Sequence, residues 1–188
     1  MSRIKAIALA LAAVLAACSG GESAPRRTQI SQVNAVIDTV VARDTSGLRG
    51  LLQLTSLPCA ETSTPAGPAC EGEDPGTSVD AFQATECENR WLRRAHLDPL
   101  LDQLTAMEPA VYAAFESPEG FYLAGRYAVI FEGIDTRSES AGVRRYFTAG
   151  IEGNGLITGI VLGCSIEEPV HFLLPHANDD FDDWLIAP

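Results

Sequence analysis

Among the side chains of this 188-residue sequence that could bind a ligand or take part in a reaction, we consider one arginine first. Arg145 alternates in phase with Val143, Phe147 and Ala149, so on a strand it would share their apolar face. A buried guanidinium needs a carboxylate or an anionic ligand to offset its desolvation. Arg145 is therefore our first pocket candidate; the alternative is that it lies at a strand end and reaches water.

Two histidines near the end of the chain raise the question of a metal site. His171 and His176 precede the run Asn178-Asp179-Asp180-Phe181-Asp182-Asp183. Their spacing matches no helical zinc motif, and the aspartates lack the glycine and terminal glutamate of an EF-hand loop. We therefore interpret the tail as a solvated acidic segment, and we predict no metal site and no cofactor.

Catalytic motifs give no further candidates. The sequence contains no Gly-x-Ser-x-Gly, no Gly-x-x-x-x-Gly-Lys and no dinucleotide fingerprint, so no catalytic residue is predicted. The chain carries 25 acidic and 13 basic residues, a net charge of −12, which argues against nucleic acid as a partner. These features favour a binding domain over an enzyme.

The start of the chain has the three regions of a bacterial export signal. Arg3 and Lys5 are followed by an apolar run over residues 6–14 and then by Leu15-Ala16-Ala17-Cys18. The order leucine, small, small, cysteine resembles the lipobox of bacterial lipoproteins. The resemblance implies that Cys18 is lipidated and anchors the protein to the extracytoplasmic side of the cell envelope, at the outer membrane if the organism has one.

Two alternatives to a lipid anchor are a plain cleaved signal and an uncleaved membrane anchor. The apolar run is shorter than the about 20 residues that cross a bilayer, which disfavours the second. We predict a signal peptide over residues 1–17, a lipidated cysteine with a flexible tether over 18–27, and a single domain over 28–188. From Cys18 onward the chain has 11 arginines, no lysine and a net charge of −14.

The chain has four further cysteines. An exported protein lies in an oxidising compartment, where cysteines form disulfides by default. The four are Cys59, Cys70, Cys87 and Cys164. Four cysteines allow three pairings. We favour a Cys59–Cys70 disulfide, which would close a loop rich in proline, glycine and threonine. Cys87 and Cys164 would then link the middle of the chain to a late strand; the alternative is two free buried thiols.

The elements that position these residues begin with a helix. Ile30, Val33, Ile37 and Val40 recur at helical spacing, and a short second helix follows over residues 45–52. Asn34 and Asp38 lie one turn apart beside the apolar face of the first helix. They are two further pocket candidates; the alternative is that both face solvent or a neighbouring loop.

The rest of the chain predicts one more helix and a series of strands. A helix is expected over 98–108, with Asp98 as its cap, and strands over 78–84, 111–116, 121–134, 143–152 and 156–164. Gly153-Asn154-Gly155 indicates a hairpin between the last two strands. This order predicts an α+β fold in which the N-terminal helices pack on a curved antiparallel sheet.

The opening helix pair resembles the NTF2-like (SnoaL-like) superfamily. Its apolar periodicity runs through Asp38 and Ala42-Arg43-Asp44 into Leu48, Leu51 and Leu52, and the closing meander fits the same plan over residues 28–165. The resemblance implies a cone-shaped fold that serves both enzymes and non-catalytic binding domains. The long cysteine loop departs from the family pattern.

Three functions follow from these observations. We favour a non-enzymatic envelope lipoprotein that binds a small molecule or an envelope protein. The first alternative is an NTF2-like hydrolase or isomerase with Arg145 and carboxylates such as Asp38 in a pocket inside the sheet. The second is a purely structural envelope lipoprotein.

Overall fold

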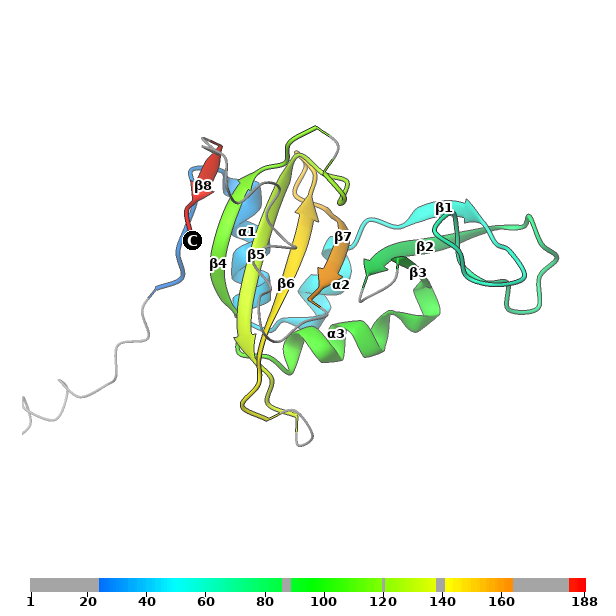
Figure 1. Cartoon of the computed structure of the whole chain (residues 1–188), viewed down its shortest axis with the longest axis horizontal. Helices are drawn as coiled ribbons and strands as arrows, with labels where there is room; N and C mark the ends of the chain where they lie inside the picture. The colour runs from blue at the N-terminus through cyan, green and yellow to red at the C-terminus, as the bar shows by residue number, and fades with distance from the viewer. Residues whose placement is uncertain (1–23, 86–88, 120, 138–140, 164–182) are drawn as a thin grey trace, which may run out of the picture.

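Three helices pack against one face of a curved sheet, and a hairpin arm projects from the end of that sheet (Figure 1). The computed structural model describes residues 24–85, 89–119, 121–137, 141–163 and 183–188. Among these residues no helix is both long and apolar enough to span a bilayer. The predicted α+β class, with helices packed on a sheet, is confirmed.

The helices are α1 (Ser31–Val41), α2 (Thr45–Leu51) and α3 (Leu97–Thr105). α1 buries the apolar face that the sequence predicts, with Val33, Val36, Ile37 and Val40 almost inaccessible to solvent. α2 begins after Asp44, whose Oδ1 accepts a hydrogen bond from the backbone N–H of Gly47 at 2.9 Å.

The predicted cap of the third helix is wrong. The 3₁₀ turn η2 (Arg94–His96) runs directly into α3, so the helix begins at Leu97 and no side chain caps it. Asp98 lies in the first turn instead and forms an ion pair with Arg49 of α2.

Eight strands form the sheet in the part of the chain that the structure describes. They are β1 (Thr55–Pro58), β2 (Ser78–Thr85), β3 (Asn89–Arg93), β4 (Ala110–Glu116), β5 (Tyr127–Ile134), β6 (Arg144–Ile151), β7 (Ile157–Leu162) and β8 (Trp184–Ile186). Their order is β1-β2-β7-β6-β5-β4-β8, with β3 paired to β2.

The sheet is mixed, which corrects the prediction of an antiparallel sheet. β2 and β7 are parallel, with Ala84 opposite Ile160, whereas the other paired strands are antiparallel. After β3 the chain passes through α3 to β4, which lies near the opposite edge of the sheet. The three reversals from β4 to β7 then bring β7 back beside β2 in the same direction.

β7 lies between β6 and β2, in the central position that its two apolar faces predict. The predicted hairpin before it is confirmed: Glu152 N–H donates to the carbonyl of Leu156 at 2.9 Å, and Gly155 has a φ of +86° that glycine adopts without strain. The sequence pattern does not predict β1, β3 and β8, because these strands are short and lie at the margins of the sheet.

The space between helices and sheet is filled by the main core. Phe82, Phe131 and Phe147 are 0% exposed there, and the rings of Phe131 and Phe147 stack with centroids 4.9 Å apart. Leu101 of α3 and Met107, just after it, are buried in the same core. Side chains thus occupy the interior in which the enzyme alternative would place its pocket.

A second, smaller cluster lies on the opposite face of the sheet. Phe115 is its buried centre, and it meets the ring of Phe121 edge-on at 5.4 Å and that of Trp184 at 5.7 Å. Tyr146 and Tyr112 make a further edge contact at 5.6 Å. β8 is thereby joined to β4 by packing as well as by hydrogen bonds.

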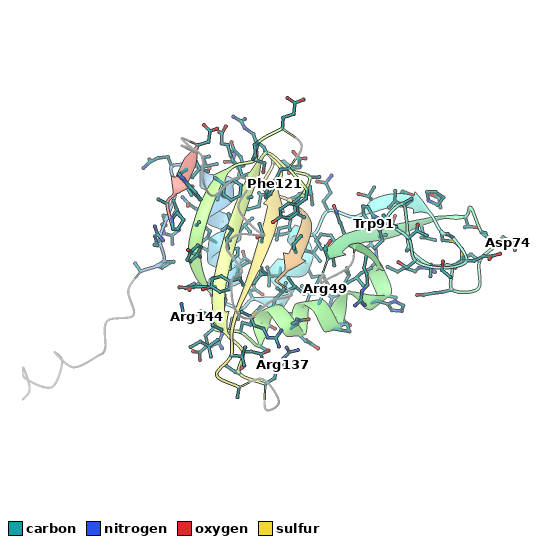
Figure 2. All side chains as sticks on the ribbon, viewed as in Figure 1. Arg49, Asp74, Trp91, Phe121, Arg137 and Arg144 are labelled. Carbon is teal, nitrogen blue, oxygen red and sulfur yellow. A yellow bond between two sulfur atoms is a disulfide. The ribbon has the colours of Figure 1, made fainter. Side chains whose placement is uncertain are left out.

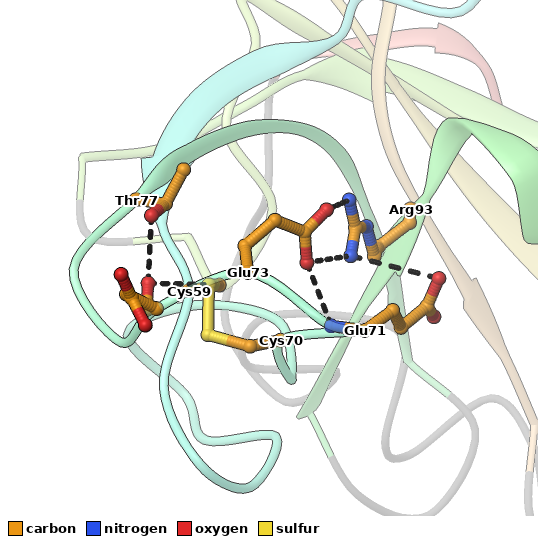
Figure 3. The surroundings of a disulfide bond; sticks show 7 residues. Cys59, Cys70, Glu71, Glu73, Thr77 and Arg93 are labelled. Carbon is orange, nitrogen blue, oxygen red and sulfur yellow. Dashed lines mark hydrogen bonds and ion pairs between the residues drawn. A yellow bond between two sulfur atoms is a disulfide. The ribbon is translucent and has the colours of Figure 1, made fainter.

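The projecting arm consists of β1, the loop over residues 59–77, β2 and β3 (Figures 1 and 3). The predicted Cys59–Cys70 disulfide is present, with the two Cα atoms 5.0 Å apart. Backbone hydrogen bonds pin the loop as well, for example from Cys59 N–H to the carbonyl of Thr77 at 2.9 Å. Cys87 and Cys164 lie outside the described residues.

Arg93 on β3 connects the loop over residues 59–77 to the strands through contacts with two glutamates of that loop (Figure 3). Its guanidinium donates to the two oxygens of Glu73 at 2.9 and 2.6 Å and lies 3.5 Å from Glu71. The hydrogen bonds from Arg93, together with a backbone N–H, lower the pKa of Glu73 to about 2. The loop is therefore an ordered part of the arm.

Candidate functional site

Arg145 lies on β6 and pairs with a carboxylate of its own chain. Its Nε is 3.1 Å from Oδ2 of Asp135, which is fully buried beyond the end of β5. Arg137 contacts the same carboxylate from its Nη2 at 2.6 Å and from its backbone N–H at 3.0 Å. Figure 2 places Arg137 at the end of the sheet where the β5–β6 connection lies. Asp135 is thus the internal partner of Arg145, whose side chain is only partly buried.

This cluster predicts a pH dependence of stability. The hydrogen bonds from Arg137 lower the pKa of Asp135 to about 2, from an ordinary value of 3.8. Because the folded state holds the deprotonated form, the stabilisation is complete above the ordinary pKa and is lost as the pH falls toward 2. We expect Asp135→Asn to flatten the dependence of unfolding free energy on pH between about 4 and 2, as measured by urea titrations.

The control for this experiment is Glu73→Gln on the arm, because the pKa of Glu73 is also lowered to about 2. Each single variant should remove part of the acid dependence. We expect Asp135→Asn to lower stability at pH 7 by about 1–2 kcal/mol, a modest value because Arg137 and Arg145 reach solvent. An unchanged acid profile in Asp135→Asn would contradict this account.

Asn34 and Asp38 belong to a different network on α1. Oδ1 of Asn34 accepts from the backbone N–H of Thr28 at 2.9 Å, and its Nδ2 donates to the carbonyl of Thr28 at 3.0 Å. Asp38 forms an exposed ion pair with Arg27 at 2.7 Å. Both side chains hold the segment before α1 against the helix, and the structure does not bring them into one site with Arg145.

The segment before α1 is also fixed at the edge of the sheet. Arg26 donates to the carbonyl of Tyr112 on β4 at 2.8 Å and to the carbonyl of Ala187. β8 pairs with β4 at Ala114 and Phe115, and among the described residues no strand lies beside the start of β4 on that edge. The N-terminal segment, the C-terminus and β4 therefore meet around Arg26.

A groove opens at this meeting point, with a volume of about 990 Å³. We call it the β4 groove. It is lined by Ala24, Pro25, Arg26, Val41, Arg43, Glu108, Pro109, Ala110, Val111, Tyr112, Glu132 and Pro188. A smaller hollow of about 160 Å³ adjoins it and shares Glu108, Ala110 and Glu132. Apolar walls and charged groups are thus combined in one open site.

Arg43 has the most unusual backbone in the groove. Its φ of +54° makes it the one residue other than glycine with positive φ in the described part of the chain. Arg43 N–H donates to the carbonyl of Val40, and Asp44 N–H donates to that of Thr39, which is the Schellman ending that normally places glycine at this position. A side chain here costs about 1–2 kcal/mol in backbone energy.

The β4 groove could not be predicted from the sequence, because its walls come from five separate stretches of the chain. The one available signal was Ala42-Arg43-Asp44, where a helix ends at arginine instead of glycine. Among the described residues no cluster of histidine, cysteine and acidic side chains is placed to hold a metal ion. His171 and His176 lie outside the described residues.

No family model and no curated protein sequence match this chain. Similar solved structures include two of RV0760c from Mycobacterium tuberculosis, one in complex with estradiol-17beta-hemisuccinate. The complex is 16% identical, covers 72% of this chain and 93% of that chain, and has a TM-score of 0.36. The other is 15% identical, covers 70% and 90%, and has a TM-score of 0.34. Overlaps this low establish neither a family nor a function.

Proposed function

We propose that the chain is a bacterial envelope lipoprotein whose α+β domain binds a small molecule in the β4 groove. The groove carries this proposal. Its volume of about 990 Å³ matches the upper range of small-molecule sites, which span roughly 300–1,000 Å³. Its walls combine apolar residues such as Val41 and Pro109 with the charged side chains of Arg26 and Arg43, a composition suited to recognition.

The order of elements supports an NTF2-like architecture for this domain. Two helices, a hairpin, a third helix and a four-strand meander follow one another, as the sequence resemblance implies. In this chain the interior beneath the helices is filled by Phe82, Phe131 and Phe147. The proposed binding site therefore lies at the sheet edge, and the proposed role is binding without catalysis.

The position of the groove fits an anchor at Cys18. Ala24, which lines the groove, follows Cys18 by six positions in the sequence. At about 3.6 Å per residue these positions span at most about 22 Å. If Cys18 is lipidated, the groove stays within that distance of the membrane surface, where a membrane-derived molecule is within reach.

Native mass spectrometry of the protein purified from its own envelope tests the proposal. We expect a small molecule to be retained, and Ala110→Trp to abolish its retention, because Ala110 is an exposed groove residue that tryptophan would overfill. Ala141→Trp, at an exposed site outside the groove lining, is the matched control and should retain the molecule.

Two outcomes would contradict the small-molecule proposal. One is an equal amount of retained molecule in Ala110→Trp, which would place the site elsewhere. The other is bare wild-type protein, and a photo-crosslink from position 110 to an envelope protein would then favour the partner-binding function. Lipidation of Cys18 is read in the same spectra as added acyl mass that Cys18→Ser removes.

A further inference from the structure

The β4 groove contains arginine side chains that no carboxylate pairs with in the part of the chain that the structure describes. The mature chain is strongly acidic, with 11 arginines against 25 acidic residues. Ten of these arginines have a hydrogen bond, an ion pair or another polar contact within the protein. Within the described part of the chain, Arg43 is the one arginine whose side chain has no such partner.

Arg26 adds a second cation to the groove. Its guanidinium donates to the neutral carbonyls of Tyr112 and Ala187, and it forms no ion pair with a carboxylate among the described residues. The acidic residues of the groove are Glu108 and Glu132, and Glu132 is already paired with Arg144 at 2.7 Å. Among the described side chains of the groove, two cations thus face one carboxylate without an ion pair, that of Glu108.

The backbone conformation of Arg43 also supports a role for its side chain in binding. A glycine at this helix ending would relieve the unfavourable backbone conformation, yet the chain places a long cationic side chain there. Strained positions of this kind gather at functional sites. A purely structural explanation is that the guanidinium offsets the negative end of α1; the experiment below separates the two.

We propose that the β4 groove takes an amphipathic anion, a molecule with an apolar chain and a phosphate or carboxylate head that Arg43 binds. Guanidinium groups match the geometry of both heads and form charge-assisted hydrogen bonds with them. Val41, Ala110 and Pro188 offer accessible apolar surface for the chain. This inference rests on the proposed function and names the ligand class of the same site.

Calorimetric titration with defined amphiphiles tests the inference. The protein is the chain from residue 18 with Cys18→Ser, and the probes are dodecyl phosphate, dodecyl maltoside and dodecyltrimethylammonium, each below its micelle concentration, with inorganic phosphate alone. We expect dodecyl phosphate to bind best and Arg43→Gly to weaken it roughly tenfold or more, the worth of one charge-assisted hydrogen bond. Binding of dodecyl maltoside should not change in Arg43→Gly.

The variants separate recognition from folding. Arg43→Gly suits the helix ending, so its melting temperature should equal or exceed that of the wild type. Arg43→Lys keeps the charge but loses the planar guanidinium, so it should bind dodecyl phosphate more weakly than the wild type and more tightly than Arg43→Gly. Arg94→Gln removes the same charge on the arm, where Arg94 pairs with Asp80, and should bind dodecyl phosphate like the wild type.

Equal affinity of Arg43→Gly and wild type for dodecyl phosphate would overturn the inference and support the structural role at the helix end. Equal binding of all three amphiphiles would also overturn it, while leaving the groove as a binding site. No binding of any amphiphile would overturn it too, and the retained-molecule experiment then decides the proposed function separately. Sedimentation with phosphatidylglycerol vesicles, against phosphatidylcholine, distinguishes a membrane headgroup from a free amphiphile as the source of the anion.

Discussion

Phe147→Ala should lower the free energy of unfolding by about 3–5 kcal/mol, the largest effect expected of any single substitution here. The ring is 0% exposed, stacks on Phe131 at 4.9 Å, and belongs to the layer between the helices and the sheet. Its removal deletes apolar contacts and leaves a cavity that the surrounding strands cannot fully close. Urea denaturation monitored by circular dichroism gives the value.

The neighbouring residue supplies the control. Tyr146 lies on the opposite face of β6, is partly exposed and packs against the smaller cluster, so Tyr146→Ala should cost only about 1–2 kcal/mol. If Phe147→Ala costs less than about 1 kcal/mol, the interior already contains empty space. That result would revive a pocket inside the sheet and with it the enzyme alternative.

Replacing both Cys59 and Cys70 by serine should have the second largest effect. The disulfide closes a separation of 11 residues, and the loss of loop-closure entropy corresponds to about 3 kcal/mol. The loss should be concentrated in the arm, because Arg93 on β3 is ion-paired to the stapled loop through Glu73. We expect trypsin to cleave the variant at Arg93 and Arg94 far faster than the wild type.

Ser56→Ala is the matched control on the same arm. Its hydroxyl meets that of Ser78 at 2.8 Å on the exposed surface, so its loss should change stability by less than about 0.5 kcal/mol. Tryptic cleavage at the wild-type rate in the double serine variant would show that hydrogen bonds alone order the arm. The disulfide would then have no part in holding the loop.

The parts of the fold that follow from local pattern were predicted correctly. α1, the hairpin at Gly153-Asn154-Gly155 and the central position of β7 depend on periodicity and turn chemistry within one stretch of sequence. The parallel pairing of β2 with β7 joins residues more than 70 positions apart, as Ala84 and Ile160 show. Short-range pattern carries no information about such a pairing.

The candidate site was predicted less well, for a related reason. Arg145 was identified by its phase on the strand, and the requirement for a carboxylate was sound, but the partner proved to be Asp135 across the hairpin. The register of the β5–β6 pair explains this contact, because Gly133 lies opposite Arg145 and Asp135 follows Gly133 by two residues. The β4 groove combines the segment before α1, Pro188 and β4, so no single stretch of sequence reveals it.

The central claim is that this protein binds a small molecule in the β4 groove. The most direct test is a two-dimensional amide NMR titration of the chain from residue 18 with Cys18→Ser, using the tightest binder of the three amphiphiles. We predict shifts confined to the groove, at residues such as Arg26, Arg43, Ala110 and Tyr112. Shifts centred on Phe131 and Phe147, or on the arm, would contradict the claim.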